Sequence, residues 1–181
     1  MLTEDIKWIA FFSQTGAEIA DICEKIGKWP TRIITNKRPD NLRTIDPRII
    51  KHGYLEMKNK PVESDYLDIL QYFTNPTITL HGWLRVIPSA VCHSYNIYNG
   101  HPGLITKYPE LKGKDPQVRA YEGKYESIGC VIHKVDPGVD EGPIHSWTEV
   151  QANKLSLNET FRILRDISLE QWTNLLKRLY G

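Results

Sequence analysis

The first 36 residues limit the fold of this chain more than any other part of its sequence. An apolar run of strand length, DIKWIAFF (Asp5 to Phe12), is followed by the polar turn SQTG and then by apolar residues at helical spacing. A second apolar run, TRIITN (Thr31 to Asn36), lies between two prolines. Strand, turn, helix and strand in this order form the βαβ unit of a parallel sheet, so the sequence predicts an α/β fold.

The remainder of the chain continues this alternation. The patterns predict strands at residues 77–82, 96–102, 127–135 and 143–151, and helices at 63–73, 117–122 and 158–180. GYLEM is a candidate short strand and IPSAVCHSY a candidate short helix, whereas the rest of the polar, proline-rich stretch from Lys37 to Pro61 gives no clear prediction. A length of 181 residues suits one domain, so we expect residues 1–181 to form a single, Rossmann-like domain with a mostly parallel sheet flanked by helices.

Charge and cysteine content exclude several classes of function. The 23 basic and 22 acidic side chains give a net charge of +1, which favours neither a nucleic-acid nor a membrane partner. The apolar runs are too short to span a bilayer, and the N-terminus does not resemble a signal peptide. The 3 cysteines show no CxxC spacing, so a disulfide framework and a thiolate metal site are not expected. These features predict a protein of a reduced, cytoplasmic compartment.

The stretch NIYNGHP contains the strongest candidate for a functional site. Asn99 and His101 are two residues apart on a predicted strand, so their side chains point to the same side. Ligands of parallel α/β sheets bind beyond the carboxyl ends of the strands, which is where this stretch lies. Taken alone, His101 is more often a hydrogen-bonded structural histidine than a catalytic one, and Asn99 is more often a turn residue.

Three motifs in order along the chain provide a resemblance to a known family. NGHPGL, GCVIH and DEGPI resemble the corresponding motifs of the folate-dependent formyltransferases, the family of phosphoribosylglycinamide formyltransferase. LHGWLRVIPSAV and TKYPEL are similar to further family segments. The similarity is dense from about Ile78 to Ile144 and weaker, but collinear, from Trp8 to Lys37.

The resemblance implies transfer of a formyl group from 10-formyltetrahydrofolate to a primary amine, without a metal. Such a transfer passes through a tetrahedral oxyanion, to which the Asn99 amide can donate a hydrogen bond. His101 can donate to the same oxygen or handle the proton of the amine. Asp140 can hold the imidazole in a useful charge state and relay protons through water.

The same resemblance assigns the folate-binding residues. The apolar pterin pocket is assigned to Trp83, Leu84, Val86 and Ile87, with Arg85 as a structural or tail-contacting base, and to a loop that includes Pro137, Gly138 and Val139. Without the motifs, residues 83–87 are equally a buried connection between a strand and a helix.

The turn SQTGAE departs from the family pattern, in which a glycine-rich turn holds a substrate phosphate at a helix N-terminus. Gly16 matches one family glycine, but Thr15 and Glu18 also fit a capping box that would occupy the free N–H groups of the helix. We therefore expect an acceptor without a phosphate at this point. Gly16 and Glu18 are assigned to acceptor binding, as is His133, which at a strand position can equally pack and support the loop.

The sequence thus predicts an N-formyltransferase acting on a small nucleotide- or sugar-like amine. Formylation of phosphoribosylglycinamide itself, hydrolysis of 10-formyltetrahydrofolate and a non-catalytic folate-binding module remain alternatives. The length leaves no room for the additional carboxyl-terminal domain of methionyl-tRNA formyltransferases. The sequence makes no prediction about the oligomeric state.

Overall fold

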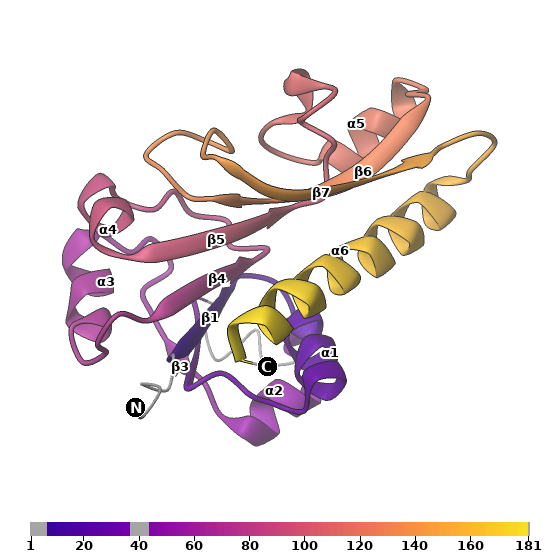
Figure 1. The fold of residues 1–181 in the computed structure, drawn as a ribbon. Coiled ribbons are helices and arrows are strands. Elements are labelled where there is room, and N and C mark those ends of the chain that lie inside the picture. The colour runs from indigo at the N-terminus through magenta and orange to yellow at the C-terminus, as the bar shows by residue number, and fades with distance from the viewer. Residues whose placement is uncertain (1–6, 37–43, 181) are drawn as a thin grey trace.

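The predicted βαβ unit lies in the middle of a single sheet, in a computed structural model that describes residues 7–36 and 44–180 (Figure 1). The 7 strands have the order β3-β2-β1-β4-β5-β6-β7. Their bounds are β1 Trp8–Phe12, β2 Arg32–Thr35, β3 Leu55–Glu56, β4 Thr77–His81, β5 Asn96–His101, β6 Ser127–Lys134 and β7 Ile144–Gln151. All strands predicted from the sequence are present; the first two residues of the run that begins at Asp5 lie outside the described residues.

The direction of the strands changes at β5. Strands β3, β2, β1, β4 and β5 are parallel to one another, whereas β6 is antiparallel to β5 and β7 is antiparallel to β6. The prediction of a mostly parallel sheet is confirmed. The antiparallel register of β5 and β6 places His133 directly opposite Asn99.

Helices cover both faces of the sheet (Figure 1). Helices α1 and α6 pack on one face around Trp8, Phe12 and the fully buried Trp172. Helices α3 and α4 pack on the other face, around Phe11 and Leu80. The helix bounds are α1 Ala17–Ile26, α2 Pro47–His52, α3 Glu63–Leu70, α4 Ser89–Ser94, α5 Pro116–Glu122 and α6 Leu157–Tyr180, with a 3-10 helix, η2, at Pro109–Leu111.

Helix α2 lies in the polar, proline-rich stretch that shows no clear pattern. Its N-cap is Asp46, whose carboxylate accepts a hydrogen bond from the Arg48 N–H at 2.8 Å, and Pro47 occupies the first helical position. Asp followed by Pro is a recognised helix start, but only six residues follow before Gly53. A segment this short has too few apolar positions to display helical periodicity.

Candidate active site

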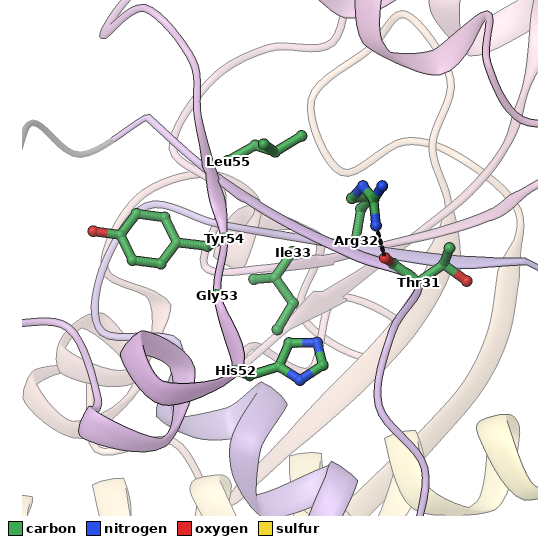
Figure 2. Close-up of a pocket in the computed structure, with 7 residues that line it drawn as sticks. All are labelled: Thr31, Arg32, Ile33, His52, Gly53, Tyr54 and Leu55. Atoms are coloured by element: carbon green, nitrogen blue, oxygen red, sulfur yellow. Dashed lines mark hydrogen bonds between the residues drawn. The ribbon is translucent and has the colours of Figure 1, made fainter.

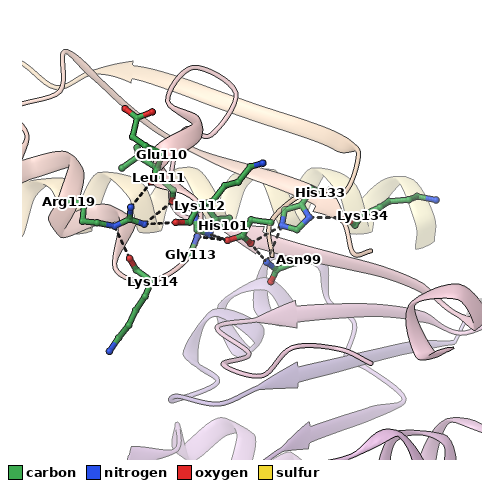
Figure 3. A network of polar contacts seen from close by, with 11 residues as sticks. Asn99, His101, Glu110, Leu111, Lys112, Gly113, Lys114, Arg119, His133 and Lys134 are labelled. Atoms are coloured by element: carbon green, nitrogen blue, oxygen red, sulfur yellow. Dashed lines mark hydrogen bonds and ion pairs between the residues drawn. The ribbon is translucent and has the colours of Figure 1, made fainter. Parts of the chain in front are cut away.

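The end of β5, the facing part of β6 and the loop after β6 bring four polar side chains together (Figure 3). Asn99 and His101 lie on the same face of β5 because they are two residues apart. His133 joins them from β6, and the loop between β6 and β7 contributes Asp140. The structure therefore brings the three residues of the expected catalytic set together, with His133 beside them.

Asp140 lies at the centre of this cluster. Its Oδ1 is 3.2 Å from His133 Nε2, and its Oδ2 is 3.4 Å from His101 Nδ1. The amide nitrogen of Asn99 lies 3.4 Å from Asp140 Oδ1 and 3.2 Å from His133 Nε2. The side chains of Asp140, His101 and His133 are only 10%, 7% and 3% exposed, so these contacts are largely shielded from water.

Main-chain groups fix both imidazoles and the carboxylate. His101 Nε2 lies 2.8 Å from the carbonyl oxygen of Leu111, and His133 Nδ1 lies 2.9 Å from that of Lys134. Because a carbonyl only accepts, each of these nitrogens carries a hydrogen. The N–H of Gly113 donates to Asp140 Oδ2 at 2.9 Å.

Arg119 holds the loop that supplies two of these main-chain groups, those of Leu111 and Gly113 (Figure 3). Its guanidinium donates to the carbonyl oxygens of Glu110 at 2.6 Å and Lys112 at 2.7 Å, and to those of Leu111 and Lys114. One cation therefore organises the stretch from Glu110 to Lys114 around the candidate site. Arg119 was not among the residues predicted from the sequence. A single basic residue on a short helix does not indicate that its side chain binds main-chain carbonyl oxygens of the preceding loop.

The loop after β6 positions Asp140 through an unusual backbone conformation. Asp140 has a φ of 52°, in the left-handed region that few non-glycine residues adopt. Two residues later, Gly142 approaches the main-chain oxygen of Lys134 so closely that a Cβ there would overlap with it. The glycine of the DEGPI motif is thus required by the close approach of two backbone segments.

Burial and neighbouring charges set the protonation of the cluster. Burial lowers the pKa of His101 below its usual value, against the opposing effect of the Asp140 carboxylate. Burial alone would raise the pKa of Asp140, but the hydrogen bond to His133 and the charge of His101 outweigh it, and the pKa is lowered. The arrangement therefore favours an ionised Asp140 and a neutral His101 at pH 7.

The residues assigned to folate binding divide into two groups. Trp83 and Ile87 are buried in the core beside α3 and α4, where the Trp83 indole donates to the Tyr66 hydroxyl at 3.1 Å. Leu84, Val86 and Val139 are 61%, 66% and 53% exposed. The remaining assigned residues are Arg85, which donates to the main chain of Asn59, and Pro137 and Gly138 in the loop beside Val139.

The predicted capping box in SQTGAE is wrong. The N-cap of α1 is Gly16 at a φ of 74°, and it is the Thr15 hydroxyl that accepts from the Ala17 N–H, at 3.2 Å. The Glu18 carboxylate turns away from the helix end, accepting from the Ser168 hydroxyl at 2.7 Å and lying 2.8 Å from Nδ1 of His81. The buried imidazole of His81 is a stronger partner for the Glu18 carboxylate than the main-chain N–H groups at the start of α1. One of those N–H groups is already bound by Thr15.

A separate cavity of about 230 Å³ lies at the opposite end of the parallel strands (Figure 2). Its lining includes Arg32, at the start of β2, together with His52 and Tyr54 between α2 and β3. The His52 ring stacks on Trp29 at 4.5 Å. No residue of the Asp140 cluster lines this cavity.

Neither a membrane-spanning helix nor a metal-binding group occurs in the part of the chain that the structure describes. None of the helices within residues 7–36 and 44–180 is both long and apolar enough to cross a bilayer. The same residues contain no set of three or more His, Cys, Asp or Glu side chains placed to hold a metal ion.

Comparison with protein families gives a match over most of the chain. A family model described as formyl transferase matches residues 10–166. Phosphoribosylglycinamide formyltransferase of Bacillus subtilis is 27% identical over 107 residues, which cover 58% of this chain and 53% of that protein. The trifunctional purine biosynthetic protein adenosine-3 of Drosophila melanogaster is 38% identical over 69 residues, 37% of this chain and 5% of its own length. The matches thus span about half the length of the Bacillus subtilis protein and a small part of the Drosophila melanogaster protein.

Solved structures share the fold over nearly the whole chain. Phosphoribosylglycinamide formyltransferase from Campylobacter jejuni has a TM-score of 0.81 at 20% identity, covering 97% of this chain and 98% of that one. A formyltetrahydrofolate deformylase from Pseudomonas syringae has a TM-score of 0.77 at 18% identity, covering 93% and 59%. A sugar N-formyltransferase from Shewanella has a TM-score of 0.72 at 19% identity, covering 96% and 70%.

Proposed function

Because this chain belongs to the formyl transferase family, we propose that it transfers a formyl group from 10-formyltetrahydrofolate to a primary amine of a small nucleotide- or sugar-like molecule. The observation that carries the proposal is the buried contact of Asp140 with His101 and Asn99 at the end of β5. An amide donor, an imidazole and a carboxylate at one point are the groups that this reaction requires.

Exposed apolar side chains on two loops fit a folate donor. Leu84 and Val86 follow the end of β4, which is the parallel neighbour of β5, and Val139 precedes Asp140 in the loop after β6. Sites for small organic ligands are lined mostly by apolar side chains with a few polar groups. The proposed donor would lie against them and supply the formyl carbon.

In the proposed reaction, the nitrogen of the acceptor amine attacks the formyl carbon and the carbonyl oxygen becomes negative. An N–H of Asn99 stabilises that charge, which is worth about 2.7–4 kcal/mol for one donor in comparable sites. The new C–N bond to the acceptor replaces the old bond to the donor. One proton leaves the acceptor nitrogen and one reaches the donor nitrogen, so the reaction conserves protons.

Asp140 is proposed to mediate this proton exchange. Its lowered pKa keeps it ionised and able to accept the proton of the attacking amine. Nδ1 of His101 lies 3.4 Å from one carboxylate oxygen, while its Nε2 remains bound to the Leu111 carbonyl. A direct bond from His101 to the substrate would require that link to Leu111 to be exchanged.

The acceptor is proposed to contact Gly16, in the turn before α1, and Glu18, in the first turn of that helix. Burial opposed by the hydrogen bond from His81 leaves the pKa of Glu18 lowered, so this carboxylate is ionised at pH 7. It faces His81 and Ser168 and not the helix end, so it gives no reason to exclude a phosphate at this turn.

Loss of the absorbance of 10-formyltetrahydrofolate tests the proposal, measured with and without a panel of sugar and nucleoside amines. We expect consumption of the donor only when a suitable amine is present. Equal consumption without any amine would indicate hydrolysis instead. No consumption, together with tight binding of the donor, would indicate a non-catalytic folate-binding module.

A further inference from the structure

The side chain of Arg119, on α5, binds the loop before that helix through all three of its nitrogens (Figure 3). Nε donates to the main-chain oxygen of Lys114 at 2.9 Å, Nη1 to that of Glu110 at 2.6 Å, and Nη2 to those of Lys112 and Leu111 at 2.7 and 3.1 Å. A guanidinium directs five N–H groups outward from one plane, whereas a lysine ammonium has three on a single atom. Binding of these four carbonyl groups therefore depends on the shape of arginine as well as on its charge.

Residues 112–115 of this loop have little apolar packing of their own. The side chains of Lys112, Lys114 and Asp115 are exposed. Gly113 has a φ of 84°, and a Cβ at this position would meet no neighbouring atom within 4 Å. Apolar burial therefore does not fix this segment, and the bonds from the Arg119 guanidinium to its main chain take that role.

Two main-chain groups of the same loop contact the candidate site. The carbonyl oxygen of Leu111 lies 2.8 Å from His101 Nε2 and also accepts from Arg119, since a carbonyl oxygen can accept two hydrogen bonds. Two residues later, the N–H of Gly113 donates to Asp140 Oδ2 at 2.9 Å. The guanidinium thus holds, through the main chain, one contact of the imidazole and one contact of the carboxylate.

We propose that Arg119 is a positioning residue that holds His101 and Asp140 in the geometry of the proposed transfer, through the main chain of Leu111 and Gly113. It acts on turnover and not on binding of the folate donor, whose proposed apolar contacts lie on other loops. The effect on catalysis rests on the proposed function, whereas the effect on the position of Asp140 does not.

The charges around Asp140 agree with this role. Burial raises the pKa of Asp140, but the hydrogen bond from His133, the charge of His101 and the N–H of Gly113 lower it, and the lowering prevails. Within the described residues, the titratable groups in contact with Asp140 are His101 from β5 and His133 from β6. Loss of the Gly113 donor would raise the pKa of Asp140, so the carboxylate would be ionised over a narrower pH range.

Amide hydrogen exchange of Gly113, followed by NMR, tests the positioning without any turnover. In the wild type this N–H is bonded to Asp140 and should exchange slowly. In Arg119→Ala it should exchange faster by about tenfold or more, as expected for the loss of a hydrogen bond to a charged group. Lys114→Ala is the matched control, because it removes a positive charge from the same loop and Figure 3 shows that side chain directed away from His101. Equal exchange in the wild type and Arg119→Ala, or the same acceleration in Lys114→Ala, would overturn the inference.

Steady-state kinetics test the consequence for turnover. In Arg119→Ala, kcat should fall by about 10–100-fold, because small displacements of catalytic groups are costly, while the affinity for a stable deaza-folate stays unchanged. Arg119→Lys keeps the charge but lacks the planar set of donors, so it should remain impaired. Guanidinium at millimolar concentration should restore part of the turnover of Arg119→Ala, whereas a protein that had only lost stability would lose more in this denaturant. Wild-type kcat in Arg119→Lys, or a further loss with guanidinium, would refute the positioning role.

The acid side of the pH profile separates this role from general destabilisation. The carboxylate form of Asp140 is lost as pH falls through its pKa, so a raised pKa should move the acid limb of kcat to higher pH in Arg119→Ala and leave it in place in Lys114→Ala. Coincident acid limbs in Arg119→Ala and the wild type would contradict the proposal. Absence of turnover in the wild type would refute the proposed function, and the exchange of the Gly113 amide would then decide the positioning alone.

Discussion

At the scale of single residues, the candidate site depends on one carboxylate with four neighbours. Asp140 contacts His101, His133, Asn99 and the N–H of Gly113, and its backbone is held at a φ of 52°. Such a conformation costs on the order of 1–3 kcal/mol and persists where surrounding contacts outweigh it. The backbone conformation of Asp140 therefore costs free energy, which its contacts with these four neighbours offset.

Asp140→Asn should reduce kcat by about 10²–10³-fold and change the affinity for a folate analogue by less than threefold. The amide keeps the shape of the side chain but cannot accept a proton, and it removes a group that acts on the reacting atoms. Steady-state kinetics give kcat, and calorimetry with a stable deaza-folate gives the affinity. Near-normal turnover would remove Asp140 from the mechanism.

Gly142→Ala should displace the loop that carries Asp140. A Cβ at this position would overlap with the Lys134 carbonyl oxygen, and both groups are backbone, so neither can rotate away. We expect a loss of about 1–3 kcal/mol in unfolding free energy, measured by urea denaturation. We also expect a loss of turnover, measured by steady-state assays of donor consumption. The control Glu141→Ala, at an exposed neighbour, should have little effect; equal effects of the two changes would show that the close approach is not what matters.

At the scale of elements, Glu18 joins three parts of the fold. Its carboxylate lies on α1, bonds the Ser168 hydroxyl of α6 and pairs with His81 at the end of β4. His81 in turn lies 2.8 Å from the Thr79 hydroxyl and 4.5 Å from the ring of Trp172. This connection fixes α1 and α6 to the carboxyl end of β4, which is next to the end of β5 that carries the candidate site.

Glu18→Gln should lower the unfolding free energy by about 1–3 kcal/mol at pH 7, the range for a hydrogen bond that involves a charged group. The folded-state pKa of Glu18 is lowered from 4.5, despite burial, by the bond to His81. Its contribution to stability is therefore complete above that value and is lost as pH falls through the folded-state pKa. Urea denaturation from pH 7 to pH 3 should show the difference between the wild type and Glu18→Gln decreasing toward acid. The exposed Glu24, changed to Gln, is the control on the same helix; a constant difference would contradict the assignment.

Periodicity and turn residues were sufficient to predict most elements. The strands and the longer helices follow from apolar alternation and 3.6-residue spacing, which are properties of neighbouring residues. The same reasoning failed at Glu18, because Thr-x-x-Glu matches a local capping pattern while the actual partners, His81 and Ser168, are 63 and 150 residues away. Local sequence does not report such distant partners.

At the scale of the whole molecule, the reversal of strand direction at β6 assembles the candidate site. A parallel sixth strand would end beside the carboxyl end of β5. The antiparallel β6 instead begins beyond the carboxyl end of β5 and runs back past His101 and then Asn99. This pairing puts His133 opposite Asn99 and lets the following loop reach His101 with Asp140. The two-residue spacing of Asn99 and His101 predicted that their side chains share one side of a strand. The contribution of His133 depends on a strand register that the sequence did not specify.

Transfer of a ¹³C-labelled formyl group is the most direct test of the proposed activity. The protein is incubated with [¹³C-formyl]tetrahydrofolate and the panel of amines, and labelled products are identified by mass spectrometry for the wild type and for Asn99→Ala. We predict a labelled formamide of one of the amines, formed about 10²–10³-fold more slowly by Asn99→Ala. Labelled formate as the sole product with every amine, or equal rates for the two proteins, would contradict the account.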